Sequence, residues 1–385
     1  MNRLRILALE PYYGGSHRAV LDGLVSGIDA EWTLLTLPAR KWKWRMRGSA
    51  ITMAAEVRRL VELPDGRVRA KGEDRPFDLI FASSFLNLAE FRGLTPQLAG
   101  VPAIVYFHEN QLVYPNRHTA EWDFQFPLTN ITTALAADRC LLNSRWNLER
   151  FVAETPPFLR QFPDHQPVGV AEAIAAKSSV LPPPFEPTAF DALRPTRGAR
   201  PRVVWPHRWE HDKNPEEFFS AVAVLADEGL EFEVAVAGQA FRDVPPVIAQ
   251  AEERLGERLV HLGEPDSREA YARLLAGSDI AVSTAVNEFF GIAMVEAAYA
   301  GCFPLVPDRL SYPELYPPSM RYRGRDGLVS RLQELLSERP SPGAGRQDAA
   351  RFTFARLVPA YEREFERVAS GETYDESPSA QGDPP

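Results

Sequence analysis

Cysteine and long apolar runs are scarce in this sequence of 385 residues. The two cysteines, Cys140 and Cys302, both have apolar neighbours, so we expect neither a disulfide framework nor a cysteine metal site. No apolar run approaches the length of a membrane-spanning helix, about 18 residues. The run at residues 6–9 is too short for a signal peptide and predicts a first strand. We therefore expect a cytoplasmic protein that makes no membrane contact.

An excess of positive charge is also missing. The formal net charge is -9 and the pI is near 5.5. This balance argues against a protein that binds nucleic acid over its whole surface, but it leaves room for a local basic patch. Hydrophobic residues make up 45% and charged residues 25%, as in soluble globular proteins, and the length suits two domains.

The first half of the chain alternates short apolar runs with helix-forming segments. Strands are predicted at residues 4–9, 32–37, 78–82, 101–107 and 139–142. Gly14-Gly15 lies between the first strand and its helix. Such a pair either cradles a phosphate or a sugar, or forms only a tight turn.

A basic stretch at residues 40–47 interrupts this acidic sequence. It holds five cations, two tryptophans and no acid. Cations bind phosphates and tryptophan faces stack on unpaired bases, so the stretch predicts a nucleic-acid contact. The alternative is a solvated turn whose tryptophans fold back into the core. The residues predicted to make the contact are Arg40, Lys41, Trp42, Lys43, Trp44 and Arg45.

Four polar residues, His108-Glu109-Asn110-Gln111, follow the predicted strand at residues 101–107. Open α/β sheets bind their ligands just past the carboxyl ends of buried strands. A lone histidine is usually structural, but the polar neighbours favour a functional role for His108.

Proline separates the two halves of the chain. Residues 156–187 are rich in proline and predict a surface segment followed by an interdomain linker. The alternation then resumes, with strands predicted at residues 202–205, 232–237, 259–263, 280–283 and 303–306. We expect an N-terminal domain at 1–185, a C-terminal domain at 186–350, a closing helix over the domain seam at 351–370 and a disordered tail at 371–385.

This order predicts an α/β protein with two doubly wound, Rossmann-like parallel sheets that face each other across a cleft. Such a cleft suits a two-substrate transferase, a dehydrogenase or a periplasmic-type binding protein. No Gly-x-Gly-x-x-Gly follows any of the predicted strands, so the fingerprint of the dehydrogenases is absent.

Two glutamates mark the strand–loop–helix pattern that ends at Gly301. Glu288 falls in the loop, Glu296 falls on the helix, and Gly291 falls at the helix start. A helix start attracts phosphate, and a carboxylate one or two turns further could bind the vicinal hydroxyls of a sugar. The alternative is a core helix with two solvated glutamates.

These residues resemble a known family. Glu288 and Glu296, with seven residues between them, resemble the Glu-x7-Glu motif of the retaining glycosyltransferases of family 4, which have the GT-B fold. Arg208 and Lys213 match that family's donor-diphosphate residues. Gly14-Gly15 matches its glycine loop near the transferred sugar, and His108 matches its histidine on the acceptor side of the anomeric carbon.

The resemblance to the tRNA-queuosine α-mannosyltransferases is closer still and reaches across residues 4–320. The shared stretches are residues 13–17, 37–45, 81–84, 106–112 and 206–213. One departure concerns the diphosphate loop, where Pro206 and His207 stand before Arg208 in place of the glycine common in family 4.

The resemblance implies that mannose passes from GDP-mannose to a cyclopentene hydroxyl of queuosine, at the wobble position of tRNA-Asp, with retention of configuration. Arg208 and Lys213, with the backbone N–H groups of Phe290 and Gly291, would stabilise the departing diphosphate. Glu296 would bind the ribose of the donor. No metal or other cofactor is expected, because the cations and the helix start neutralise the diphosphate.

The remaining residues complete the implied site. Glu288 would sit against the mannose hydroxyls, and His108 would orient the sugar. The basic stretch would meet the anticodon loop, and Glu109, Asn110 and Gln111 would contact the acceptor. Asp123 and Gln125 are weaker candidates for the same pocket.

Two alternatives stay open. One is a family 4 enzyme that uses another nucleotide sugar, or a polysaccharide or lipid acceptor. A polysaccharide or lipid acceptor would predict an apolar or amphipathic membrane-facing helix in the first domain, and the sequence suggests none. A tRNA-binding protein with an inactive transferase fold is the alternative from another class. The intact Arg208, Lys213, Glu288 and Glu296 argue against it.

Overall fold

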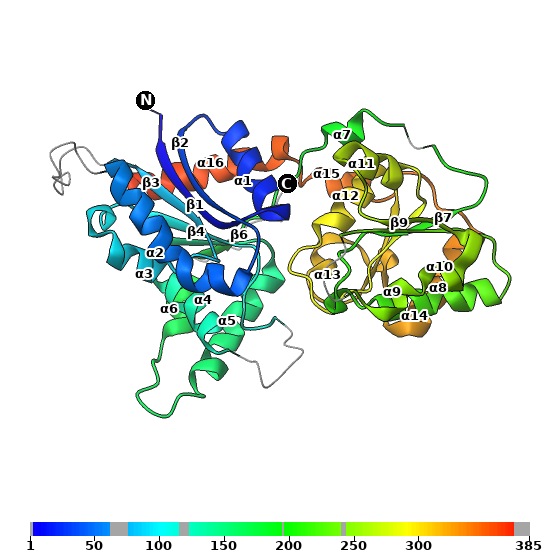
Figure 1. Cartoon of the computed structure of the whole chain (residues 1–385), viewed down its shortest axis with the longest axis horizontal. Coiled ribbons are helices and arrows are strands. Elements are labelled where there is room, and N and C mark those ends of the chain that lie inside the picture. The colour runs from blue at the N-terminus through cyan, green and yellow to red at the C-terminus, as the bar shows by residue number, and fades with distance from the viewer. Residues whose placement is uncertain (1–2, 62–75, 115–122, 195, 240–243, 373–385) are drawn as a thin grey trace. The chain divides into compact units, whose positions relative to one another are not determined.

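The computed structural model describes residues 3–61, 76–114, 123–194, 196–239 and 244–372. The chain divides into two compact units (Figure 1). Unit 1 comprises residues 1–184 and 357–385, and unit 2 comprises residues 185–356. From residue 373 onward, the predicted disordered tail lies outside the described residues.

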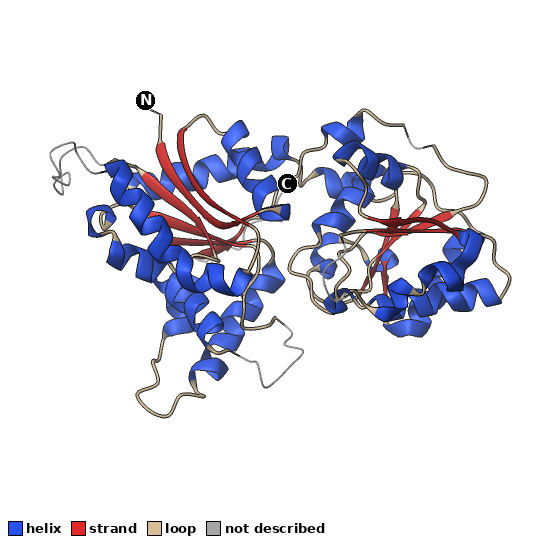
Figure 2. Cartoon of the chain, in the orientation of Figure 1, coloured by secondary structure: helices blue, strands red, loops and turns tan. Residues whose placement is uncertain are grey.

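Unit 1 is built on a six-stranded parallel sheet with helices on its two faces (Figure 2). Its strands are β1 (Arg5–Tyr13), β2 (Glu31–Pro38), β3 (Leu79–Ser83), β4 (Ala103–Phe107), β5 (Arg139–Leu142) and β6 (Ser178–Val180). They lie in the order β2-β1-β3-β4-β5-β6. The chain reverses its direction of travel across the sheet between β1 and β3. Ligands of doubly wound sheets bind at this switch point, beside the carboxyl ends of the strands.

The helices of unit 1 cover an apolar sheet. They are α1 (Gly15–Gly27), α2 (Trp42–Val61), α3 (Leu88–Leu94), α4 (Gln125–Ala136), α5 (Arg145–Leu159), α6 (Val170–Ala176) and α16 (Phe354–Ser370). Alternate residues of each inner strand point to opposite faces, and the strands are buried on both. From α16, Phe365 packs on Phe81 with ring centroids 5.2 Å apart, and the Tyr361 hydroxyl donates to the Pro182 carbonyl.

The proline-rich segment differs from its prediction as a surface segment and linker. Pro156 and Pro157 lie inside α5, and α6 and the edge strand β6 follow. Leu142 pairs with Val180 in the register of the sheet. Hydrophobic residues between the prolines provide the reason, because Phe158, Leu159 and Ile174 are buried in the core of unit 1.

Unit 2 repeats the design on a second six-stranded parallel sheet. Its strands are β7 (Arg202–Trp205), β8 (Glu233–Ala237), β9 (Leu259–Gly263), β10 (Ile280–Val282), β11 (Phe303–Pro307) and β12 (Arg321–Tyr322), in the order β12-β11-β10-β7-β8-β9. Its helices are α7 (Thr188–Asp191), α8 (Pro215–Asp227), α9 (Pro246–Ala249), α10 (Ala251–Leu255), α11 (Arg268–Ala276), α12 (Ile292–Ala300), α13 (Tyr312–Leu315), α14 (Gly324–Ser337) and α15 (Arg346–Ala350). The switch point falls between β7 and β10, as in dinucleotide-binding folds.

The prediction of two doubly wound parallel sheets is thus confirmed. Each unit has its own apolar core, with Phe91, Phe107 and Phe151 buried in unit 1 and Trp205 and Phe218 buried in unit 2. Among the helices of the described ranges, none combines the length and the apolar character that a membrane span requires.

Candidate functional site

In unit 2, the loops after β7 and β10 meet at the switch point. Lys213 closes the short 3-10 turn His211–Lys213 and is only 6% exposed. Its Nζ donates to the Asn287 carbonyl at 2.7 Å and lies 3.3 Å from Glu288 Oε2. The second loop is fixed from its backbone too, because the N–H groups of Val286 and Asn287 donate to the Asp212 carbonyl. Lys213 and Glu288, two predicted site residues that lie 75 positions apart in the sequence, are therefore neighbours in the structure.

Two neighbouring carboxylates keep Lys213 protonated. Burial alone would lower the pKa of the ammonium, but Glu288 and then Asp212, whose Oδ2 lies 3.1 Å away, raise the pKa above its usual value. The group stays protonated at neutral pH. An ammonium carries three donors, and the hydrogen bonds to Asn287 and Glu288 use two of them, so one donor, beside Asp212, is left for an additional anion.

Arg208 lies on the same loop but closer to solvent. Its side chain is half-exposed and lies 3.1 Å from Glu210 Oε2. The neighbouring His207 is buried, and burial, followed by the charge of Lys213, lowers its pKa to about 3. A glycine does lie next to this loop, just past the end of β8. A Cβ at Gly238 would collide with the His207 carbonyl, so glycine is needed for the two segments of the chain to approach this closely.

Helix α12 begins as predicted, just past Gly291. Gly291 has φ 97°, and a Cβ there would lie 2.8 Å from the Tyr312 ring, so both the conformation and the space require glycine. The first N–H groups of the helix have no intrahelical acceptor. The Phe290 N–H points to Glu288 Oε1 at a long 3.5 Å.

Glu296 has a partner that the sequence did not suggest. Its carboxylate is nearly buried and accepts a hydrogen bond from Arg268 Nη2 at 2.5 Å. Arg268 in turn lies over the rings of Phe190 and Tyr271. Arg268 comes 28 residues earlier on α11, and no motif links the two positions. Glu296 keeps free acceptor capacity, because a carboxylate has about four lone-pair sites.

In unit 1, the glycine loop follows β1. Gly14 is the N-cap of α1 and a Cβ there would collide with that of Ala39, while Gly15 has φ 53°. The loop thus needs both glycines for its shape. His17, in the first turn of α1, is buried beside it.

The loop after β4 is held by buried amides. The Asn143 side chain donates to the His108 carbonyl at 2.6 Å. Asn110 is 0% exposed; its amide donates to Asn147, and its oxygen accepts from the Leu112 N–H. Asn110 therefore shapes the loop, and the predicted direct contact with the acceptor does not fit its burial. Glu109 and Gln111 are only partly buried, and Gln111 Nε2 donates to Glu109 Oε1.

The basic stretch begins two residues before α2 and continues through the first turn of that helix. Arg40, Lys41, Lys43 and Arg47 are exposed, as is Trp44 at 62%. Trp42 is partly buried against Phe126, with ring centroids 5.1 Å apart, so one of the two tryptophans folds back as the alternative required. Asp123 is ion-paired with Arg47.

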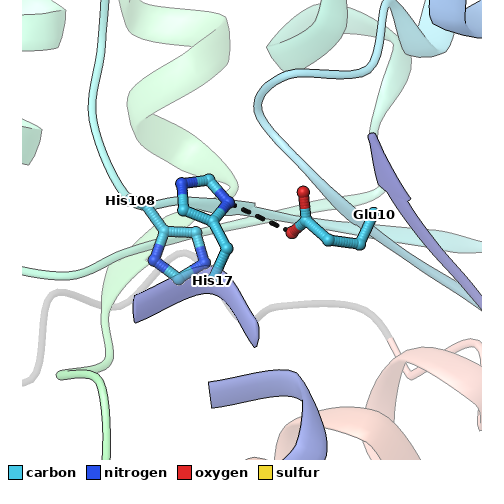
Figure 3. A group of neighbouring side chains, drawn as sticks. All are labelled: Glu10, His17 and His108. Atoms are coloured by element: carbon cyan, nitrogen blue, oxygen red, sulfur yellow. Dashed lines mark hydrogen bonds and ion pairs between the residues drawn. The ribbon is translucent and has the colours of Figure 1, made fainter. Parts of the chain in front are cut away.

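Three side chains gather at the switch point of unit 1: Glu10 from β1, His17 from α1 and His108 from the loop after β4 (Figure 3). The two imidazole rings stack with centroids 3.8 Å apart, and Glu10 Oε2 lies 3.2 Å from His17 Nδ1. Burial, followed by the electrostatic influence of the adjacent His17 ring, holds the pKa of His108 well below its usual value. Ligand atoms of the three residues lie within 4.8 Å of one another, so they are close enough to share one ion or one small polar group.

The basic helix and this cluster belong to one packed body. Met46 of α2 is buried against Phe85 and Phe126. Phe85 stacks on Tyr12 and meets the edge of the His17 ring, with centroids 5.0 and 5.2 Å away. Aromatic contacts therefore fix the basic stretch relative to His17 and His108. Glu10 and His17 were not predicted as site residues; an acid near the end of a buried strand was the available signal.

Known proteins share both units. Residues 5–185 match the family described as tRNA-queuosine alpha-mannosyltransferase N-terminal, and residues 193–318 match the family described as glycosyl transferases group 1. A tRNA-queuosine alpha-mannosyltransferase of Drosophila melanogaster is 38% identical over 337 residues, which cover 85% of each chain.

Solved structures agree on the fold. A sucrose-phosphate synthase from Thermosynechococcus elongatus superposes with a TM-score of 0.69 at 13% identity, covering 96% of this chain and 100% of that one. The Anabaena protein HepE in complex with UDP superposes with a TM-score of 0.65 at 15% identity, with the same coverage. The predicted GT-B fold class is confirmed. By its 38% identity over 85% of the length, this glycosyltransferase chain belongs to the tRNA-queuosine alpha-mannosyltransferase family.

Proposed function

We propose that this protein transfers mannose from GDP-mannose to a hydroxyl of queuosine, at the wobble position of tRNA-Asp, with retention of configuration. The observation that carries the proposal is the 38% identity, over 85% of both chains, to a protein named for tRNA-queuosine mannosylation. Since the acceptor is a tRNA, we place the activity in the cytoplasm.

The loops at the switch point of unit 2 would bind the donor. The bond between the anomeric carbon and the diphosphate breaks, and its electron pair leaves with GDP. Negative charge then grows on the diphosphate, and Lys213, kept charged by its acidic neighbours, is preorganised to stabilise it. Arg208 and the start of α12 would add to this field.

The two glutamates would bind the two sugars of the donor. Glu296, held by Arg268, would accept hydrogen bonds from the ribose hydroxyls. Glu288, held by Lys213, would contact the mannose. Lys213 would then touch the diphosphate and hold the sugar-binding carboxylate at once, so donor affinity and sugar orientation would depend on the same ammonium.

The acceptor would bind to unit 1. His108 is neutral because of its lowered pKa, so its ring would orient the sugar by hydrogen bonds without adding charge near the anomeric carbon. The exposed cations at the start of α2 would bind the phosphates of the anticodon loop, and Trp44 would stack on an unpaired base. We assign no metal to the reaction, because cationic side chains and a helix start would serve the diphosphate.

Retention has two routes. A covalent glycosyl-enzyme intermediate needs a second carboxylate against the anomeric carbon. Glu288 is already engaged with Lys213, so we favour attack by the acceptor hydroxyl on the face from which GDP leaves. The hydroxyl proton would pass to the departing phosphate oxygen.

Nucleoside analysis tests the proposal. The protein is incubated with GDP-mannose and queuosine-containing tRNA-Asp, the tRNA is digested, and the nucleosides are weighed. One added hexose on queuosine is expected, and it should be absent when UDP-glucose replaces GDP-mannose. Unmodified queuosine after incubation with GDP-mannose would refute the proposal.

A further inference from the structure

Glu10 and His17 have no role in the function proposed above, although both are buried at the switch point of unit 1. Glu10 is 4% exposed and His17 is 7% exposed. They come from β1 and from the first turn of α1, on either side of the glycine loop. Polar groups buried this deeply need partners.

Glu10 acts only as a hydrogen-bond acceptor in this cluster. Its Oε1 accepts from the Tyr12 N–H at 2.8 Å and from Ser83 Oγ at 2.9 Å. Its Oε2 faces His17 Nδ1 at 3.2 Å. A carboxylate offers no hydrogen, so Nδ1 of His17 carries one and donates it. In the neutral form of an imidazole with its hydrogen on Nδ1, the lone pair lies on Nε2.

Neighbouring rings fix where this lone pair lies. The His17 ring stacks on His108 at a tilt of 26°, and the Tyr12 ring meets it with a centroid distance of 5.8 Å and a tilt of 70°. Among the described residues, the His17 ring makes one hydrogen bond, to Glu10, and makes it through Nδ1. Nε2 is therefore an acceptor held in place and still unused.

A cavity of about 10 Å³ adjoins the dyad. Its polar lining comes from Glu10, His17, Ser83, Tyr106 and His108. The volume is that of about one water molecule, and hence of one hydroxyl group. Tyr106 does not supply that hydroxyl, since its own donates to the Leu181 carbonyl at 3.0 Å.

We propose that His17 Nε2 accepts a hydrogen bond from a hydroxyl of a bound polyol, with Glu10 as the positioning residue that fixes the tautomer. This inference rests on the proposed function, which supplies two sources of such a hydroxyl: the transferred hexose and the cyclopentene ring of the acceptor. The two stacked histidines thereby have different roles: His108 orients the sugar, and His17 accepts a hydrogen bond from a hydroxyl beside it.

Glu10→Gln tests the tautomer. The amide oxygen must stay with the Tyr12 N–H, an obligatory donor, so the new NH2 group faces His17 Nδ1. The ring then carries its hydrogen on Nε2 and loses the acceptor. Nitrogen-15 NMR of histidine-labelled protein should show the unprotonated nitrogen of His17 move from Nε2 to Nδ1. The kcat of transfer should fall about 10- to 100-fold, as expected when one hydrogen bond to the bound hydroxyl is lost.

The matched control is Asp138→Asn. Asp138 is also a carboxylate of unit 1 that accepts a backbone bond, from the Ala103 N–H, but at the amino end of β4. It should leave the His17 signals and kcat unchanged. If Glu10→Gln behaves like Asp138→Asn, the proposal is overturned. Should Glu10→Gln fail to fold, His17→Asn keeps a donor for Glu10 and removes Nε2; unchanged transfer in that variant also overturns the proposal.

Further arms separate the sources of the hydroxyl and the failure modes. Loss of transfer with unchanged GDP-mannose hydrolysis in the absence of tRNA assigns the hydroxyl to the acceptor, and loss of both assigns it to the hexose. One equivalent of zinc that survives dialysis in the wild type but not in His17→Asn would overturn the dyad in favour of an ion site. If the wild type transfers no mannose, the proposed function fails. The NMR signals of His17 and the rate of GDP-mannose hydrolysis would then still test whether Glu10 fixes the tautomer of His17.

Discussion

Lys213 Nζ and Glu288 Oε2 lie 3.3 Å apart, although the two residues follow different strands of the second sheet. The strands concerned, β7 and β10, are neighbours at the point where the chain reverses its course across the sheet. Both loops leave the carboxyl ends of those strands, so topology alone brings the cation and the acid together. The pair predicts how donor binding and transfer respond to substitution.

Replacing Lys213 by Met should abolish donor binding. The change leaves Glu288 and Asp212 without their shared cation, and it removes the charge that meets the diphosphate. We expect GDP affinity by calorimetry to fall at least about 100-fold, and the free energy of unfolding to fall by about 3 kcal/mol. Glu288→Gln is the control. It keeps the ammonium, so GDP should bind within about threefold of the wild type while transfer is lost. Equal GDP binding by Lys213→Met would contradict this assignment.

The Arg268–Glu296 pair should control affinity for the ribose. Glu296→Ala removes the proposed acceptor and should weaken GDP binding by about 10- to 100-fold. Arg268→Met leaves the carboxylate but frees it to rotate, so a smaller loss of about tenfold is expected. Dideoxy-GDP, which lacks both the 2'- and the 3'-hydroxyl of the ribose, should bind wild type and Glu296→Ala alike. An equally large loss of affinity for dideoxy-GDP on Glu296→Ala would speak against ribose binding.

The exposed start of α2 should set tRNA affinity without affecting the donor. Lys43→Ala with Trp44→Ala removes an exposed cation and the exposed tryptophan. Binding of tRNA should weaken by about 1–3 kcal/mol for the lost stacking. The salt dependence should become shallower by about one ion, while GDP affinity stays unchanged. Arg59→Ala, an exposed cation near the other end of α2, is the control. Unchanged tRNA affinity in the double variant would make the stretch structural.

His207 should make the protein less stable in acid. Its pKa is lowered to about 3 in the folded state by burial and by Lys213, against about 6.5 in an unfolded chain. The unfolded state therefore binds more protons between these values, and stability falls as the pH falls from about 6.5 toward 3. The slope contributed is up to about 1.4 kcal/mol per pH unit.

Urea unfolding at several pH values between 7 and 4 would measure that slope. His207→Phe keeps an aromatic ring beside Trp205 and should flatten the slope. His165→Asn is the control, because His165 is exposed and asparagine tolerates its φ of 45°. An unchanged slope in His207→Phe would show that His207 is not the titrating group.

Local patterns in the sequence predicted the sheets and the start of α12 well. Buried parallel strands read as short apolar runs, and Gly291 marks the helix start because only glycine fits its φ and its contact with Tyr312. The proline-rich segment was misjudged, since its prolines concealed core residues such as Phe158 and Ile174. Proline content alone does not separate a linker from a helix that ends on the core.

Long-range partners were beyond the reach of the sequence. No residue near Glu296 in the sequence indicates its pairing with Arg268. Glu10 is recognisable as a site residue only from its contacts with Ser83, on a neighbouring strand, and with His17, in the first turn of α1. Asn110 showed the opposite error. As one of four consecutive polar residues it predicted a surface contact, but folding buries it and uses both ends of its amide. The ligand roles of the other site residues remain predictions.

Transfer of radiolabelled mannose from GDP-mannose to purified tRNA-Asp, with and without queuosine, tests the central claim most directly. We expect label only in the queuosine-containing tRNA, in an amount that approaches one mannose per queuosine, and none with Lys213→Met. Label in both tRNAs, or in neither, would contradict it.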